Sequence, residues 1–135
     1  MTEPLFRRHL MPEARVPGQW YRNATAMIDV SDGLLIDLSR LCNESRLGAR
    51  LYEEKIPISA EMRAAASCLG LSPLTLALSG GEDYELLFTA SPEKKVKALH
   101  IGDITKSKRV IVDSAGQERS FSAEGYQHFA NDNTI

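Results

Sequence analysis

Apolar residues recur at three- and four-residue spacing in one stretch of the chain, a pattern that predicts an amphipathic helix. We expect this helix to run from about Asp32 to about Arg46. Its apolar stripe consists of Leu34, Leu35, Leu38, Leu41 and Cys42. Its opposite, polar face carries Asp37, Arg40, Asn43 and Glu44. Gly48 follows just past the end, where a glycine suits a helix C-cap, so this helix is the best-defined element of the sequence.

Short apolar runs predict strands on either side of the helix. They lie at 24–30, 48–57, 84–90, 101–105 and 109–113. Three further helical segments are predicted: one after Ser59, whose hydroxyl can cap it, one at 74–78, and a short charged one that begins at Ser91. Helices and strands follow one another in irregular order, which favours an α+β fold with helices packed on a mixed β-sheet.

Residues 1–23 are polar and carry prolines at positions 4, 12 and 17, a composition typical of an arm or interdomain linker. We expect a single α+β domain over 24–130 and a frayed tail at 131–135, because 135 residues suffice for one compact domain and little more. Such an arm is an unusual start for a domain and a natural continuation from a preceding one. The sequence therefore predicts the second domain of a larger enzyme.

Composition and charge exclude several classes of function. The net charge is −2 and the pI is near 5.9, whereas domains that bind nucleic acid are usually basic, so nucleic-acid binding is not expected. No apolar run approaches the roughly 20 residues that span a bilayer, and the N-terminus lacks the apolar stretch of a secretory signal. Cys42 and Cys68 lie in predicted helices, where buried free thiols are expected. We expect a cytoplasmic protein that binds neither nucleic acid nor membranes.

Two carboxylates flank a predicted tight turn between the first strand and the central helix. Asp29 and Asp32 belong to the run Asp29-Val30-Ser31-Asp32-Gly33, so both can converge on a hard cation such as Mg²⁺, which prefers oxygen ligands. The helix N-terminus behind them favours a nearby phosphate. An alternative needs no chemistry: Asp29 as N-cap, with Asp32 in the first helical turn, would form a capping-box-like arrangement that contributes about 1 kcal/mol.

A second candidate is the acidic run Ser79-Gly80-Gly81-Glu82-Asp83-Tyr84-Glu85. Paired glycines let the backbone turn sharply and approach a ligand, and the three acids concentrate negative charge. The alternative is a helix C-cap and a turn into the next strand, with the acids in solvent. A third candidate, at 125–129, offers Tyr126 and His128, either as a ligand shelf or as a small anchor onto the core.

Several nucleotide-binding and metal-binding motifs are absent from the sequence. An acid follows Gly80-Gly81 where a P-loop has lysine, and no dinucleotide-binding fingerprint follows the run at 24–30. Neither H-E-x-x-H nor a zinc-like spacing of cysteine and histidine occurs. The candidate chemistry is therefore acid-rich and lacks an evident nucleophile.

Two of these stretches together resemble the signatures of one family, the thiamine-monophosphate kinases. Residues 26–34, AMIDVSDGL, are similar to the entry to the second domain of that family, and residues 78–88, LSGGEDYELLF, resemble its second signature. The segment 8–16, with its RHL and later RV, resembles the connection between the family's two domains. Residues 102–105 and 125–129 resemble later landmarks, so the likeness covers nearly the whole chain.

The resemblance implies a fold and an activity. The fold is that of the C-terminal domain of the aminoimidazole ribonucleotide synthetase superfamily, and the activity is transfer of the γ-phosphoryl group of ATP to thiamine monophosphate, giving thiamine diphosphate. By motif position the resemblance implies that Asp29 and Asp32 bind magnesium, Ser31 contacts ATP, Glu82 contacts the substrate and Tyr126 stacks on the thiamine. Phosphoryl transfer suits an acid-rich site, because it needs positioning and charge neutralisation more than covalent chemistry.

The chain departs from the family pattern in two ways. The resemblance implies an N-terminal domain that supplies most of the metal-binding aspartates, and this domain is missing from the sequence. We therefore expect no kinase activity from this chain alone. The segment between Phe88 and Ile101 is shorter than in the family. Two other functions stay open: a sister enzyme of the superfamily with another phosphorylated substrate, and a non-catalytic ligand-binding module. Glu82 could also hold the cationic thiazolium ring or a further metal.

Overall fold

Helix α2 (Leu34–Ser45) is the element around which the others pack in the computed structural model, which describes residues 3–122. Leu38 is 3% exposed, and the helix begins and ends within two residues of the predicted bounds, so the prediction is confirmed. The predicted C-cap is wrong. The helix ends at Ser45, its C-cap is Arg46 in the left-handed conformation (φ 53°), and Gly48 already belongs to the next strand.

Two β-sheets form among the described residues. Strands β1 (Ala24–Val30) and β3 (Glu85–Ala90) make an antiparallel pair in which Val30 lies opposite Glu85. The second sheet has the order β4-β2-β5-β6. Its strands are β2 (Gly48–Tyr52), β4 (Gly102–Thr105), β5 (Arg109–Val112) and β6 (Glu118–Ser120). Strand β2 pairs antiparallel with β4 and parallel with β5, so the predicted α+β fold with a mixed sheet is confirmed.

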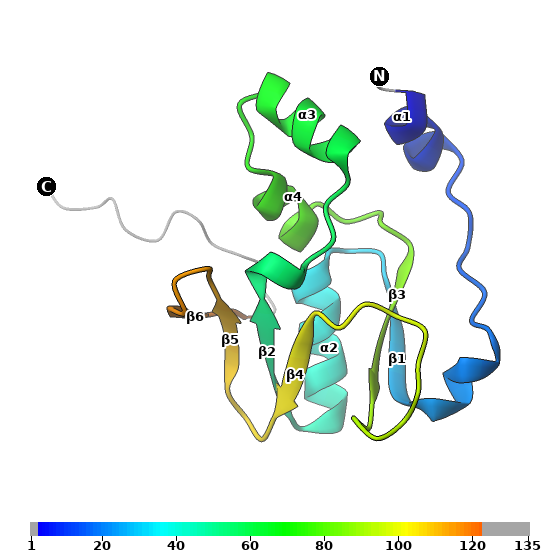
Figure 1. Cartoon of the computed structure of the whole chain (residues 1–135), viewed down its shortest axis with the longest axis vertical. Coiled ribbons are helices and arrows are strands. Elements are labelled where there is room, and N and C mark those ends of the chain that lie inside the picture. Colours follow the sequence, from blue (N-terminus) through cyan, green and yellow to red (C-terminus); the bar gives the residue numbers. More distant parts are fainter. Residues whose placement is uncertain (1–2, 123–135) are drawn as a thin grey trace, which may run out of the picture.

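The hydrophobic core forms where α2 faces both sheets. Helix α2 contacts β1 of the first sheet and β2 of the second, and Figure 1 shows it running behind the strands between the two. The buried core residues are Val30, Leu34, Leu35, Leu38, Cys42, Ala49, Leu51, Ile56, Leu78, Ile111 and Phe121. A fully buried leucine contributes about 1.5–3 kcal/mol. This burial fixes the N-terminal end of α2, and with it the turn that carries the first motif.

Two of the smaller helices, α3 (Ala60–Cys68) and α4 (Pro73–Ser79), lie together at one end of the molecule (Figure 1). Helix α3 is capped by Ser59, whose Oγ accepts the N–H of Met62 at 3.1 Å, as predicted. Helix α4 packs against both α2 and α3. A short 3-10 helix, η2 (Glu53–Lys55), ends the strand that was predicted to reach 57. No helix within residues 3–122 combines the length and apolarity needed to cross a bilayer.

Several local predictions are wrong. The charged segment after Ser91 forms a turn instead of a helix, with the N–H of Lys94 donating to Ser91 O. The arm contains helix α1 (Glu3–Leu10) and the 3-10 helix η1 (Gln19–Asn23) where irregular chain was expected, and β6 was not foreseen. Both cysteines are free, but only Cys42 is buried and Cys68 is exposed. The predicted domain end at 130 and tail at 131–135 lie outside the described residues.

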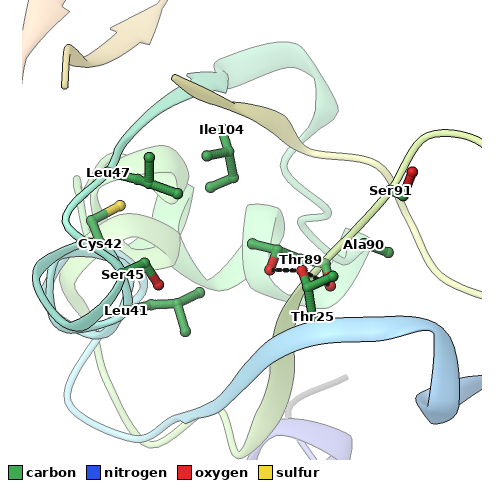
Figure 2. A pocket seen from close by; sticks show the side chains of 9 residues that line it. All are labelled: Thr25, Leu41, Cys42, Ser45, Leu47, Thr89, Ala90, Ser91 and Ile104. Carbon is green, nitrogen blue, oxygen red and sulfur yellow. Dashed lines mark hydrogen bonds between the residues drawn. The ribbon is translucent and has the colours of Figure 1, made fainter. Parts of the chain in front are cut away.

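A cavity of about 240 Å³ opens where β3 ends. Figure 2 shows it between the C-terminal end of α2 and the facing ends of β3 and β4. Its lining is Thr25, Leu41, Cys42, Ser45, Leu47, Thr89, Ala90, Ser91 and Ile104. Thr25 and Thr89 close one side through a 2.7 Å hydrogen bond between their hydroxyls. Among the described residues, none of the predicted site residues (Asp29, Ser31, Asp32 and Glu82) lines this cavity.

Candidate functional site

The turn between β1 and α2 carries the first motif, and the carboxylate of Asp37 holds its backbone. Asp37 is 1% exposed, and its Oδ2 accepts the N–H groups of Ser31 at 2.9 Å and of Asp32 at 3.0 Å. Such bonds are what a carboxylate needs to offset the loss of water on burial. The predicted place of Asp37 on a polar, outward face is therefore wrong. A residue in the first turn of α2 fixes the backbone just before that helix.

Arg40 joins this turn to the same carboxylate. Its Nη1 donates to Asp37 Oδ1 at 2.7 Å and to Asp32 Oδ2 at 2.5 Å. The hydrogen bonds to Asp32 and Asp37 raise the pKa of the Arg40 guanidinium. Both oxygens of Asp37 are thus bonded, while the side chain of Asp32 stays 53% exposed. Asp29 is also exposed, at the end of β1 opposite Leu86, so the turn presents two accessible carboxylates.

The capping alternative for these carboxylates is wrong. Helix α2 begins at Leu34, its N-cap is Gly33, and no side chain caps it. Asp29 lies in β1, and Asp32 precedes the helix. Neither carboxylate is therefore used as a helix cap.

The second motif passes from α4 into β3 through a strained turn. Gly80 is the C-cap of α4 and β3 begins at Glu85, which confirms the predicted path from helix to turn to strand. Glu82 (φ 57°) and Tyr84 (φ 50°) both adopt left-handed backbone conformations. This conformation costs a residue with a side chain about 1–2 kcal/mol. Strained residues of this kind concentrate at functional sites.

Backbone hydrogen bonds lock the two motifs together. The N–H of Glu82 donates to Ser31 O at 2.7 Å, and the N–H of Tyr84 donates to Val30 O at 2.8 Å. The same Ser31 that donates its N–H to Asp37 therefore accepts from the second motif through its carbonyl. The two motifs, about 50 residues apart in sequence, form one structural unit.

One glycine in each motif permits this close contact. At Gly81 (φ 68°) a Cβ would lie 3.1 Å from Ser31 O, and at Gly33 (φ 130°) it would lie 3.3 Å from Ser79 Cα. Both positions combine a backbone conformation that favours glycine with little room for a side chain. Each motif thus contains a glycine that the backbone of the other requires.

The arm binds the start of β3 through two arginines. Arg15 donates from Nε and Nη2 to the two oxygens of Glu85, each at 2.9 Å, and Arg8 binds the same carboxylate. Burial raises the pKa of Glu85, but the hydrogen bonds from Arg15 and Arg8 outweigh it and hold that pKa below its ordinary value. The hydrogen bond from Arg15 to Glu85 likewise raises the pKa of Arg15. Glu85 is therefore an ion-paired carboxylate, not a solvated one as the alternative interpretation proposed.

Glu82 and Asp83 of the motif also contact the arm. His9 Nδ1 lies 3.2 Å from Glu82 Oε2, and Arg8 Nη2 donates to the backbone oxygen of Asp83 at 3.3 Å. Burial raises the pKa of the Asp83 carboxyl, while the charge of Arg8 partly opposes that effect. Glu82 keeps 59% of its side chain exposed, so it is the accessible acid of this motif.

The structure brings most of the predicted site residues to one place. Asp29, Ser31 and Asp32 lie where β1 ends and α2 begins, and Glu82 is hydrogen-bonded to Ser31. Tyr126 lies outside the described residues. The arrangement combines exposed carboxylates, a helix N-terminus and a strained turn, which together suit a ligand that carries phosphate and cations.

Sequence reasoning missed the residues that support this site. For Asp37 a signal existed: an acid in the first helical turn, a few residues after a tight turn, can accept the N–H groups that the turn exposes. For the pairs of Arg8 and Arg15 with Glu85 no local signal existed, because 77 and 70 residues separate the partners.

The exposed carboxylates of Asp29 and Asp32 have the chemistry of magnesium ligands, and Asp32 Oδ2 is also bound by Arg40. Their oxygens are hard ligands, and Mg²⁺ is commonly held by one or two carboxylates together with water and substrate phosphates. Within residues 3–122, no group of three or more histidine, cysteine, aspartate or glutamate side chains is arranged to hold a metal. A magnesium ion at this turn would therefore need ligands beyond these two carboxylates.

Comparison with known proteins identifies the class first. The sequence profile of the family "AIR synthase related protein, C-terminal domain" matches residues 7–113, and the chain belongs to this family. Its relatives are thiamine-monophosphate kinases. The chain is 36% identical to that of Aquifex aeolicus over 132 residues and 37% identical to that of Salmonella typhimurium over 141. In each case 93% of the chain is covered, against 41% and 42% of the relative, so the chain spans less than half of these proteins and matches their C-terminal part.

Comparison with solved structures finds similarity to the same family. The chain superimposes on thiamine monophosphate kinase from Aquifex aeolicus with a TM-score of 0.73 and 32% identity, over 88% of this chain and 41% of that one. A structure of AaThiL complexed with AMPPCP and TMP gives the same TM-score and identity, over 94% of this chain and 41% of that one. The hydrogenase maturation protein HypE, at 19% identity and a TM-score of 0.56, over 72% of this chain and 35% of that one, shares the fold alone.

Replacing Asp37 by asparagine should destabilise the chain. An amide has one accepting oxygen, so either the N–H groups of the turn or Arg40 lose their acceptor. We expect Asp37→Asn to lower the free energy of unfolding by about 1.5–3 kcal/mol, the range for a hydrogen bond to a charged group. Urea unfolding followed by circular dichroism measures this. Glu44→Gln, exposed on the same helix, is the control and should change little; equal stability of both variants would contradict the role of Asp37.

The ion pairs of Glu85 should make stability depend on pH. Because the folded chain holds the pKa of Glu85 below its unfolded value, the stabilisation is present above the unfolded pKa and is lost as pH falls through the folded one. Glu85→Gln should therefore be less stable than the unaltered chain near pH 7, and the difference should shrink as pH falls and vanish below the folded pKa of Glu85. Urea midpoints across this range test it, with exposed Glu93→Gln as control. A deficit that persists unchanged at low pH would speak against the ion pairs.

Proposed function

We propose that this chain is the C-terminal domain of an ATP- and magnesium-dependent thiamine-monophosphate kinase, with residues 1–23 as the arm that connects it to the rest of the enzyme. The supporting observation is the joining of the two motifs into one unit by the bond between the N–H of Glu82 and Ser31 O. A relative at 32% identity has been solved with AMPPCP and TMP, which supports ATP and thiamine monophosphate as ligands of the complete enzyme.

In this proposal the first motif serves the nucleotide. Asp29 and Asp32 hold magnesium, which supplies neutralisation of the phosphate charge when bound. Ser31 contacts ATP. Its backbone is fixed on both sides, by Asp37 and by Glu82, so a contact made there needs little reorganisation. The first turn of α2 leaves backbone N–H groups without helical partners, and these attract phosphate oxygens.

The second motif serves the substrate. The exposed carboxylate of Glu82 sits on a turn that is fixed to the first motif, so it can place an acid at a set position relative to the nucleotide. A carboxylate suits the cationic thiazolium ring of thiamine, and Tyr126 stacks on that ring. No residue of this chain acts as a nucleophile in the proposed reaction, because the substrate phosphate itself attacks the γ-phosphoryl group.

The proposed enzyme needs its N-terminal domain for turnover. Two exposed carboxylates leave most of an octahedral magnesium site to other ligands. A triphosphate that met Asp29, Asp32 and Glu82 without further cations would be repelled. The chain alone is therefore inactive in this proposal, and its partner within the enzyme supplies the remaining metal ligands.

A chimaeric kinase tests the proposal. This chain replaces the matching C-terminal part of the Aquifex aeolicus enzyme, and the formation of thiamine diphosphate is measured with and without Mg²⁺. We expect metal-dependent product from the chimaera and none from the chain alone. In the chimaera, Asp32→Asn should lower kcat at least ~100-fold, because each 1.36 kcal/mol of lost transition-state stabilisation is tenfold in rate. The KM for thiamine monophosphate should change little.

Glu44→Gln is the matched control and should leave kcat unchanged. A folded chimaera that forms no product would contradict the kinase assignment, and product from the chain alone would contradict its dependence on the N-terminal domain. Normal turnover of Asp32→Asn with lowered stability would leave Asp32 only a structural role, through Arg40.

A further inference from the structure

The arm contacts the strained turn of the second motif at three points. Arg15 grips Glu85 with two parallel hydrogen bonds of 2.9 Å, Arg8 binds the same carboxylate and the backbone oxygen of Asp83, and His9 faces Glu82. Figure 1 shows why this is possible: α1 lies beside α3, and the extended segment after it passes alongside β3 and β1 instead of leaving the molecule. The arm is therefore a structural partner of residues 82–85 and not a free connection.

The turn needs such a partner because its backbone is strained. Glu82 and Tyr84 adopt φ values of 57° and 50°, where L-residues rarely stay without support. Within the domain, the support is one hydrogen bond for each residue, to Ser31 O and Val30 O. The arm adds one bond to the peptide oxygen of Asp83, which lies between these two residues, and further bonds to the side-chain carboxylate of Glu85, which follows them.

Single ion pairs at this exposure contribute little. The side chains of Arg8, Arg15 and Glu85 are 53%, 59% and 41% exposed, and an isolated pair at the surface stabilises by at most about 1 kcal/mol. Here two guanidinium groups share one carboxylate, and Arg15 binds it in the two-bond geometry that fixes orientation as well as distance. The arrangement is thus better suited to holding a conformation than to adding overall stability.

We propose that Arg8 and Arg15 are positioning residues: by binding Asp83 O and Glu85, they hold the left-handed turn at 82–84 and so set the direction in which Glu82 points. The inference deepens the proposed function, because it rests on Glu82 as the acid that contacts the substrate. It gives the arm a role in substrate binding that acts through the turn at 82–84.

Hydrogen exchange of single amides tests the proposal on the complete 135-residue chain. Exchange of the Glu82 and Tyr84 amides reports on opening of the turn, since both are hydrogen-bonded to the first motif. In the double variant Arg8→Gln/Arg15→Gln we expect these amides to exchange about tenfold faster or more, while the amide of Leu38 in α2 is unchanged. Arg15→Lys should fall between, because an ammonium group cannot form the two-bond fork.

The chain offers a matched control in the arm. Arg7 carries the same charge, is 77% exposed, and pairs only loosely with Glu13 at 3.8 Å, so Arg7→Gln should leave the exchange of both amides unchanged. Unchanged exchange in the double variant would overturn the proposal. So would equal acceleration by Arg7→Gln, which would indicate a general effect of charge.

A second readout separates this inference from the proposed function. In the chimaeric kinase, the double variant should raise the KM for thiamine monophosphate about tenfold or more with a smaller effect on kcat, because a misdirected Glu82 weakens binding of the substrate. Faster exchange with an unchanged KM would overturn the link between the turn and the substrate. Faster exchange of the turn in a chain whose chimaera has no kinase activity would refute the proposed function and leave the positioning of the turn by the arm intact.

Discussion

The buried carboxylate of Asp37 is the contact on which the geometry of the site depends. Its oxygens accept two backbone N–H groups of the first motif and one guanidinium N–H of Arg40, and it is almost completely removed from water. A buried charge is tolerated only when it is bonded in this way, so the turn cannot relax without leaving the charge unpaired. From this anchor the order extends outward: Ser31 is fixed by Asp37, and Glu82 is fixed by Ser31.

The acids of the site differ in burial and in partners, and therefore in role. Asp37 is buried and structural, and Glu85 is committed to two arginines of the arm. Asp29, Asp32 and Glu82 are exposed, and these are the acids that a cation or a cationic substrate can reach. The apolar core formed by α2 and the two sheets stabilises this arrangement, because it holds the end of β1 next to the start of α2.

Much of this fold follows from patterns along the chain. The leucine stripe predicts α2, and Ser59 predicts the start of α3, because each is a local signal that the structure uses locally. The two motifs were recognised as separate runs, but the hydrogen bond that joins Glu82 to Ser31 depends on the pairing of β1 with β3, which no local pattern encodes. The left-handed backbone conformation of Glu82 and Tyr84 could not be predicted from the sequence either, because non-glycine residues adopt it mainly under tertiary constraint. The helix predicted after Ser91 does not form, because a capping signal alone does not supply an apolar face that the helix could bury.

The central claim is that the two motifs form one cation-binding and ligand-binding site, and paramagnetic broadening by Mn²⁺ tests it most directly. Broadening of an amide signal falls off steeply with distance from the ion and detects even weak binding, so the ¹⁵N-labelled chain can be used as it is. The account predicts that the amides of Ser31, Asp32 and Glu82 broaden together at low Mn²⁺ concentration, while those of Thr89 and Ile104 beside the cavity of Figure 2 do not. Broadening confined to one motif, or strongest at another part of the surface, would contradict it.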